Sequence, residues 1–290
     1  MYLNLKGPLW LRRTAEQAAD FFFPWGTYCI CCGNFIDGRR SYCLCDHCIR
    51  KMTFGNVEIP PQSLKHNQFT GPEAERLQLE GGIPLDSIRA CMKYGLYERR
   101  LIFELKYNGH TYVARILARM IADRLAFDSS EDTRRMVEEA DFIIPVPMFR
   151  KKEKERGFNQ AASVAGYLGN FLSIPVLKDG LARGEQTAAQ RSIEGRDRLA
   201  NLEGAFRPGM VRMPKNYREK SALSLPRKIP LAEAVRGKNV ILLDDIFTTG
   251  ATVIQCGRVL KEAGAARVDV VVAASGNDFA EGFFLQNERK

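Results

Sequence analysis

The pattern of hydrophobic and polar residues predicts two strand–loop–helix–strand units. The clearer unit begins with an apolar run at residues 239–243, which stops at two adjacent acids, Asp244 and Asp245. A short Thr/Gly loop follows, and then a helix-compatible stretch at residues 251–263 and a β-branched run at residues 267–273. Two apolar strands joined by a helix are typical of a parallel sheet. We therefore expect an α/β fold.

The second unit lies earlier in the chain. Residues 141–147 read as a short apolar strand, followed by a charged loop at 148–160, a helix at 161–171 and a strand at 174–177. Parallel strands end at the same edge of a sheet, where α/β proteins bind ligands. We therefore expect the loops of both units to lie close together.

Three further elements precede these units. Residues 87–94 read as a strand and residues 96–107 as a helix. Residues 113–125 give the clearest helical pattern. The apolar positions that carry this pattern are Val113, Ile116, Leu117, Met120, Ile121 and Leu125.

The chain divides into three parts. We expect residues 1–58 to hold an amphipathic helix at 9–23 and a cysteine cluster, residues 59–85 to form a linker rich in Pro, Gly and charge, and residues 86–290 to form the main domain. With 290 residues and 45% hydrophobic content, the chain can bury a real core.

Two features of composition suggest the location of the protein. Its apolar runs are far shorter than the ~18 residues that a membrane span needs. Leu9–Trp10–Leu11–Arg12–Arg13 interrupts any signal-peptide core. We expect a cytoplasmic protein without a membrane span, and association into a homo-oligomer stays open.

The net charge of +9 is concentrated in one stretch. Residues 207–238 contain nine Lys or Arg and two Asp or Glu, and four prolines argue against a regular helix there. We expect an extended basic surface insertion. Two interpretations of this stretch stay open: it contacts nucleic acid electrostatically, or it is a solvated loop without a partner.

Six of the eight cysteines fall between residues 29 and 48. Two Cys-x-x-Cys pairs separated by twelve residues have the spacing of two knuckles that hold one tetrahedral Zn²⁺. Such a ribbon either contacts nucleic acid or a partner, or replaces a core in a short segment. The predicted ligands are Cys29, Cys32, Cys45 and Cys48, with Cys31, Cys43 and His47 close enough to compete.

The loop after the two acids has the composition of a phosphate site. Small residues let backbone N–H groups at a helix start approach an anion, and the helix dipole favours a phosphate there. Asp244 and Asp245 would repel that phosphate, so we read them as acceptors for a sugar diol, assisted by a divalent metal. Together these features describe a ribose 5-phosphate site. Its phosphate-binding residues are Thr248, Thr249, Gly250, Ala251 and Thr252.

Basic residues elsewhere suit a pyrophosphate. Arg150, Arg156 and Gly157 lie in the charged loop of the second unit. Residues 183–201 are polar and carry arginines throughout, as suits a flap that closes over a polyanion. Its predicted contacts are Arg183, Thr187, Gln190 and Arg196. Lys106 either reaches a phosphate or only offsets a helix dipole.

These motifs together define a resemblance. An apolar strand ending in Asp–Asp is also found in P-loop nucleotidases, but their G-x-x-x-x-G-K-[ST] string is absent. Residues 240–252 instead resemble the phosphoribosyl pyrophosphate (PRPP) motif of type I phosphoribosyltransferases. The full order of motifs resembles the ComF (ComFC) family of competence-associated proteins. It comprises the two knuckles, Leu105–Lys106–Tyr107–x–Gly109, Pro145–Val146–Pro147, Arg156–Gly157–Phe158–Asn159–Gln160, Arg183–x–x–x–Thr187–x–x–Gln190, Arg196–x–x–x–x–Asn201 and the PRPP motif.

The resemblance implies a twisted parallel sheet of the type I phosphoribosyltransferase kind, flanked by helices, with a small N-terminal zinc ribbon. It implies binding of PRPP with Mg²⁺ and transfer of phosphoribose to a nitrogen acceptor that the sequence does not identify. An alternative is a non-catalytic accessory protein that binds single-stranded DNA or DNA-uptake proteins. The intact run from Asp244 to Thr252 favours the enzyme.

Overall fold

We describe a computed structural model of the chain at residues 26–37, 40, 42–64, 82–107, 111–184, 204–213 and 228–276. The predicted helix at 9–23 lies outside these residues. So do three of the predicted flap contacts, Thr187, Gln190 and Arg196.

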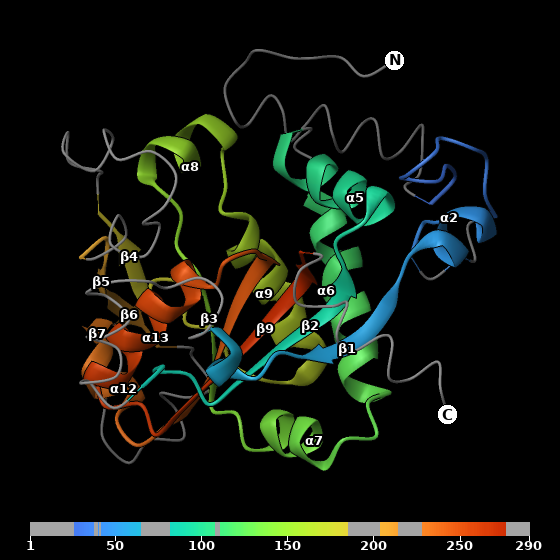
Figure 1. The fold of residues 1–290 in the computed structure, drawn as a ribbon. Helices are drawn as coiled ribbons and strands as arrows, with labels where there is room; N and C mark the ends of the chain where they lie inside the picture. The colour runs from blue at the N-terminus through green and yellow to red at the C-terminus, as the bar shows by residue number, and fades with distance from the viewer. Residues whose placement is uncertain are drawn as a thin grey trace.

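A five-stranded sheet forms the centre of the molecule (Figure 1). Its last four strands run parallel, and only the edge strand β1 is antiparallel to its neighbour. The predicted α/β class with a mostly parallel sheet is confirmed. In sheet order, the strands are β1 (Phe54–Glu58), β2 (Ser87–Lys93), β9 (Arg267–Ser275), β8 (Asn239–Phe247) and β3 (Phe142–Pro145).

Helices cover both faces of this sheet. Along β8, Val240 and Leu242 join one buried cluster while Ile241 and Leu243 join the other, as the alternation of a strand requires. The first cluster lies against α13 (Ala251–Glu262) and α12 (Leu231–Val235). The second contains residues of α5 (Leu96–Tyr107), α6 (Thr111–Ala126) and α9 (Gln160–Leu172).

Several predicted elements are confirmed, with small shifts. The helices predicted at 96–107, 113–125, 161–171 and 251–263 correspond to α5, α6, α9 and α13. The strand predicted to stop at two acids continues through both of them to Phe247. The two acids are therefore part of the ladder with β9, not the start of the loop.

Two local predictions are wrong. The loop predicted at 148–160 contains a helix, α8 (Arg150–Arg156), whose Lys, Arg and Glu residues are good helix formers. Gly157 ends α8 in the left-handed conformation (φ 83°). The strand predicted at 174–177 is only an isolated parallel bridge between Ile143 and Val176.

The ends of the basic stretch 207–238 differ from an exposed insertion. Two short antiparallel pairs form there, and Val211 and Ile229 are buried in the core. Residues 214–227 of this stretch lie outside the described ranges. The pairs are β4 (Leu181–Arg183) with β5 (Phe206–Pro208), and β6 (Met210–Arg212) with β7 (Lys228–Pro230).

The N-terminal part of the described chain packs onto the second cluster. It contains α2 (Asp46–Lys51), and β1 follows it as an edge strand that the sequence pattern does not predict. The predicted linker begins with a 3₁₀ turn, η1 (Pro61–Ser63), and buries Ile59 and Leu64. No described helix is long and apolar enough to cross a membrane.

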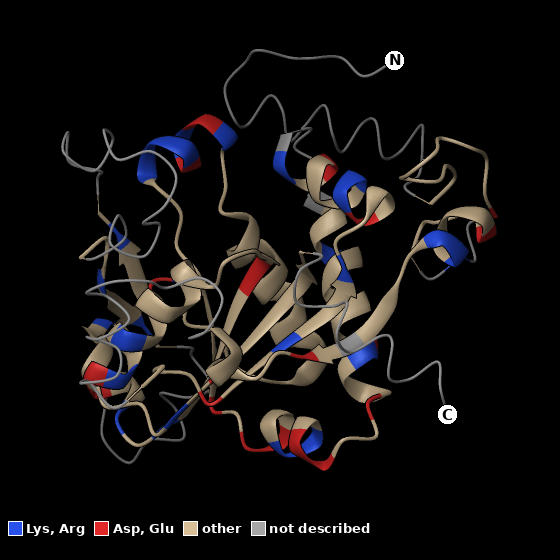
Figure 2. Cartoon of the chain, in the orientation of Figure 1, with Lys and Arg blue, Asp and Glu red and all other residues tan. Residues whose placement is uncertain are grey.

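Charges are distributed unevenly around the sheet (Figure 2). Lys and Arg residues of α8 lie beyond the edge at which β3 and β8 end, while α7 (Glu131–Glu138) lies at the opposite edge with acidic residues in and around it. The positive edge is the one that carries the predicted phosphate loop.

Candidate active site and metal centre

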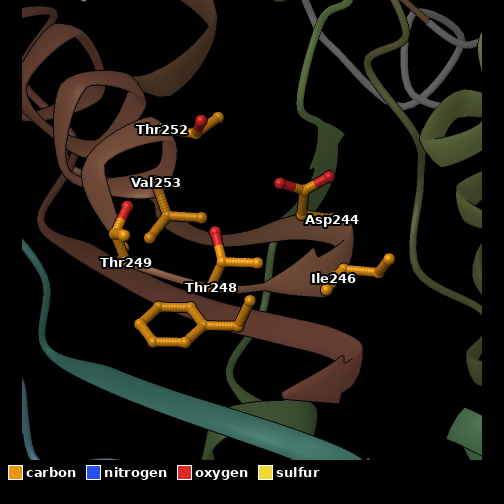
Figure 3. A pocket seen from close by; sticks show the side chains of 8 residues that line it. Asp244, Ile246, Thr248, Thr249, Thr252 and Val253 are labelled. Carbon is orange, nitrogen blue, oxygen red and sulfur yellow. The ribbon is translucent and has the colours of Figure 1, made fainter. Parts of the chain in front are cut away.

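The loop between β8 and α13 forms a small pocket (Figure 3). The Asp244 carboxylate and the hydroxyl groups of Thr248, Thr249 and Thr252 lie around it. The N-cap of α13, Gly250, has no side chain to cap the helix, and the one described side-chain contact to the first turn is the long one from Ala251 N to Oγ1 of Thr249 at 3.5 Å. The backbone N–H groups of this turn therefore face the pocket with the positive end of the helix dipole. This is the arrangement in which a helix start binds a phosphate.

Gly250 makes the turn into α13 possible. Its φ of 80° is left-handed, and a Cβ there would lie 3.0 Å from Cζ of Phe247 and 3.2 Å from Cδ1 of Leu64. Any other L-residue would therefore meet both backbone strain and steric crowding. The glycine keeps the loop close against the core.

The two acids point to opposite sides of the sheet. Asp244 follows Val240 and Leu242 in the alternation and faces the α13 side, where it lines the pocket. Asp245 faces the α5 side, and its Oδ2 accepts from Nζ of Lys106 at 2.5 Å. The sequence suggests a matched pair, and the fold gives the two carboxylates different neighbours.

The electrostatics of the pair are unfavourable in the absence of a ligand. Burial, and then the charge of Asp245, raises the pKa of Asp244 to about 8, while Lys106 acts in the opposite direction. Two carboxylates this close disfavour ionisation of one another. A cation or a hydrogen-bond donor at the pocket would relieve this repulsion.

Lys106 has a partner that the sequence does not indicate. Its predicted roles are a phosphate contact and a cation at a helix end. In the structure it lies in the last turn of α5 and forms an ion pair with Asp245, with side-chain exposures of 21% and 15%. The pair is thus partly shielded from water, and no sequence signal links these two positions.

The three predicted pyrophosphate-binding arginines that the structure describes differ in their surroundings. Arg150 begins α8 and is exposed, and Arg156 ends α8 and donates to Oε1 of Gln160 at 3.3 Å. Arg183 stacks between two aromatic rings, with its guanidinium 3.8 Å from the Phe149 ring centroid and 5.1 Å from that of Phe206.

Arg183 is close enough to the pocket to sense its charge. Burial lowers the pKa of Arg183, whereas the charge of Asp244 raises it. Its Nε is buried and has no hydrogen-bond partner among the residues that the structure describes. The two rings therefore fix a cation beside the pocket, and one of its donors is unused.

Four cysteines converge in the N-terminal ribbon. The sulfur atoms of Cys29, Cys32, Cys45 and Cys48 all lie within 4.8 Å of one another. Local structure brings them together: Cys29 accepts from Gly33 N through its carbonyl, and Cys45 is the N-cap of α2. Four thiolates at this separation can hold one tetrahedral metal ion.

The competing residues stand apart from this group in the structure. Cys31 donates through Sγ to the carbonyl of Tyr97 at 3.6 Å, and His47 faces the Tyr97 hydroxyl. Burial raises the pKa of Cys43. Within the four-cysteine group, the Cys48 N–H donates to Sγ of Cys45 and lowers its pKa to about 7, whereas burial raises the pKa of Cys48.

Comparison with known proteins agrees with this architecture. Residues 208–281 match the phosphoribosyl transferase domain family. Competence protein F of Haemophilus influenzae is 28% identical over 170 residues, which cover 59% of this chain and 64% of that protein. Competence protein ComFC of Streptococcus pneumoniae is 24% identical over 223 residues, covering 77% and 83%. The resemblance to the ComF family is confirmed.

A further relative is the DNA utilization protein YhgH of Escherichia coli K12, which is 28% identical over 170 residues. These cover 59% of this chain and 63% of YhgH. The match thus spans less than two thirds of the length of Competence protein F and of YhgH.

Solved phosphoribosyltransferases are similar at low scores. The glutamine PRPP amidotransferase of B. subtilis is 19% identical with a TM-score of 0.32, covering 59% of this chain and 30% of that one. An adenine phosphoribosyltransferase is 15% identical with a TM-score of 0.29, covering 59% and 74%. We therefore base the fold on the topology, the cysteine cluster and the family match, which confirm the predicted fold class.

Proposed function

We propose that the chain is a phosphoribosyltransferase that binds PRPP with Mg²⁺ and transfers phosphoribose to a nitrogen acceptor. The observation that carries this proposal is the start of α13, whose N-cap glycine has no capping side chain, beside the half-buried carboxylate of Asp244 at the end of a parallel strand. A carboxylate would repel a phosphate bound at the helix start unless it faced hydrogen-bond donors. The pair therefore suits a ligand that carries both a phosphate and a diol.

The residues present fit the groups of PRPP. The N–H groups of residues 250–252 and the hydroxyls of Thr248, Thr249 and Thr252 would bind the 5-phosphate. Asp244 would accept hydrogen bonds from the ribose hydroxyls, because a sugar diol donates and a carboxylate only accepts. Arg183, Arg156, Arg150 and the Gly157 backbone would bind the pyrophosphate. Thr187, Gln190 and Arg196 stay predictions for the same role.

The chemistry needs no protein nucleophile. The acceptor nitrogen attacks C1 of the ribose, the C1–O bond breaks, and pyrophosphate leaves with its electron pair. The chain holds the reacting atoms in line and stabilises the developing charge. Mg²⁺, when bound, would neutralise the pyrophosphate, and the hard oxygen donors of Asp244, which lines the pocket, suit that ion. Asp245, which pairs with Lys106 on the α5 side, stays a prediction for the same role.

We further propose Zn²⁺ as the occupant of the four-cysteine group. Four thiolates in two Cys-x-x-Cys knuckles are the usual donor set of a structural zinc site. Four sulfur ligands complete the tetrahedral coordination of the metal and leave no position for a substrate. The metal would therefore stabilise the ribbon. The location in the cytoplasm and any self-association stay predictions.

Calorimetric titration tests the enzyme proposal. PRPP should bind in the presence of Mg²⁺ and bind much more weakly with EDTA. The double variant Asp244→Asn/Asp245→Asn should lose most of the metal-dependent affinity, while ribose 5-phosphate should still bind weakly through the threonine loop. Equal affinity with and without Mg²⁺, or in the double variant, would contradict the proposal.

A second candidate function is DNA handling, either beside the first or in place of it. Relatives are named Competence protein F and DNA utilization protein YhgH. On the ribbon, Tyr28 and Phe35 are 50% and 75% exposed and lie edge to face, with ring centroids 6.0 Å apart. Exposed aromatic rings can stack on the bases of a single strand.

Fluorescence anisotropy with a labelled single-stranded oligonucleotide separates the two functions. Binding that weakens steeply with salt and falls at least tenfold in Tyr28→Ala/Phe35→Ala supports a role in DNA handling. Unchanged binding in that variant would show that these two aromatic residues of the ribbon do not bind the oligonucleotide.

A further inference from the structure

We propose that the four-cysteine ribbon and the carboxylate pair are mechanically connected through α5, with Lys106 as the positioning residue at its end. Metal occupancy of the ribbon would then set the geometry of Asp245. The inference rests on the proposed function only for its ligand readout. Its structural readout is independent of PRPP.

The connection begins at the two knuckles. Cys31 lies between Cys29 and Cys32, and its thiol donates to the Tyr97 carbonyl at 3.6 Å. His47 lies in the other knuckle, and its Nε2 is 3.4 Å from the Tyr97 hydroxyl. Each knuckle therefore contacts the same residue in the first turn of α5.

Glu98 makes a second link between the ribbon and this helix. Its Oε1 accepts from the backbone N–H of Thr53, which follows α2, at 2.8 Å. Its Oε2 accepts from the N–H of Gly95 at 3.1 Å, just before α5 begins. Only 2% of Glu98 is exposed, so losing either donor would leave a buried carboxylate underpaired.

Helix α5 connects the ribbon contacts at its first turn to Asp245 at its last turn. It is continuous over 12 residues, and Leu101, Ile102 and Leu105 are almost fully buried in the cluster that also contains the ribbon cysteines. A packed helix moves as a unit rather than bending locally. Its last turn carries Lys106, whose ammonium contacts Asp245 at 2.5 Å.

Lys106 holds the carboxylate that does not face the pocket. Because Asp245 points to the α5 side, its orientation is fixed by this ion pair and not by the threonine loop. Displacing α5 would release Asp245 and change the field at Asp244. The ribbon would thus act on the site through position, without touching the substrate.

Hydrogen exchange of the full chain tests the structural part. Removing zinc with a chelator should raise exchange at least tenfold at residues 101–107 and at 244–246, and leave the far half of α13, residues 255–262, unchanged. Unchanged protection at 101–107 would overturn the inference. Should chelation unfold the whole chain, Tyr97→Ala with zinc bound replaces it. This variant removes the His47 contact but keeps the backbone carbonyl that Cys31 contacts, so it should give a smaller increase at the same residues.

A double-mutant cycle tests the role of Lys106. PRPP affinity with Mg²⁺ is measured for Tyr97→Ala, Lys106→Met and the double variant, with Arg99→Ala, exposed on the same helix, as the matched control. We expect a tenfold loss in Lys106→Met, a smaller loss in Tyr97→Ala, which removes only the His47 contact, no additional loss in the double variant, and no change in the control. Additive losses would overturn the inference.

Substitution by another cation sharpens the same test. Lys106→Arg should recover most of the affinity lost in Lys106→Met if the role is to pair with Asp245. Equal losses in the two variants would contradict that role. A wild type that does not bind PRPP at all would refute the proposed function alone, and the hydrogen-exchange comparison would then decide this inference.

Discussion

The four-cysteine group and the pocket at the start of α13 differ in how far each is preorganised before a ligand binds. The four cysteines converge through short turns and the start of one helix, and their sulfurs already lie within 4.8 Å of one another. The pocket at α13 instead combines a partly buried carboxylate with a raised pKa and a helix start without a side-chain cap. The ribbon is built for stability, whereas the pocket keeps unfavourable charge for a ligand to neutralise.

This comparison shows that the two sites affect the free energy of the folded state in opposite ways. A structural metal site lowers the free energy of the folded state directly. A binding site that keeps a repelling carboxylate raises this free energy until the ligand arrives. Removing a thiolate from the ribbon and removing the Asp244 charge from the pocket should therefore change stability in opposite directions.

The largest effect is expected in the ribbon. Cys32→Ala should lose the bound metal and reduce the free energy of unfolding by at least about 3 kcal/mol, since three thiolates no longer complete a tetrahedral site. Denaturant unfolding with metal analysis measures both. Cys43→Ala is the control, because this buried cysteine lies in the same ribbon outside the four-sulfur group and should keep one metal per chain. Equal metal content in the two variants would contradict the assignment.

The next effect has the opposite sign. Asp244 has a folded-state pKa of about 8 against an unfolded value near 3.8, so the folded carboxyl keeps a proton that the unfolded chain has lost. Its contribution to stability is therefore present at low pH and is lost as the pH rises through 8. Asp244→Asn should stabilise the ligand-free protein by about 2 to 4 kcal/mol more at pH 9 than at pH 5, since the charge penalty grows by up to ~1.4 kcal/mol per pH unit between pH 5 and 8. Denaturation across this pH range measures it, and a pH-independent difference would refute the charge argument.

A smaller effect is expected at the turn into α13. Gly250→Ala should destabilise the fold by about 1 kcal/mol and weaken PRPP binding, because φ is 80° and the new Cβ meets Phe247. Gly264→Ala is the matched control: its φ is 93°, but it lies at the other end of α13. Thermal unfolding should show a similar cost for both, and calorimetry a loss of affinity only for Gly250→Ala. Equal affinities would exclude the loop as the phosphate site.

The smallest effect concerns the stacked arginine. Arg183→Lys keeps the charge but loses the planar group between Phe149 and Phe206, so we expect a stability loss of about 0.5 to 1 kcal/mol. Denaturant unfolding at matched pH measures it. A loss above that range would indicate a larger structural role for this residue than the stacking explains.

Local patterns account for what the sequence predicts well. The strand, loop and helix around Asp244 form from contiguous residues, and the two Cys-x-x-Cys pairs are each a single turn, so spacing alone predicts where both candidate sites lie. The fold class and four of the helices follow from hydrophobic periodicity, which reports burial directly.

Tertiary relations account for what the sequence does not predict. The charge-rich segment 150–156 reads equally well as a loop or a helix, because none of its residues is buried. The pairing of residues 181–183 with 206–208 depends on a distant partner strand. The contact between Lys106 and Asp245 joins positions 139 residues apart, and no periodic pattern encodes it.

Thermal unfolding with PRPP and Mg²⁺ together tests the central claim most directly. At 100 times the dissociation constant, the ligand should stabilise the wild type by about 2.7 kcal/mol, a shift of several degrees in the midpoint. The shift should require both PRPP and Mg²⁺ and should vanish in Asp244→Asn/Asp245→Asn. A folded, zinc-loaded protein whose midpoint does not move would show that the pocket at α13 is not a PRPP site.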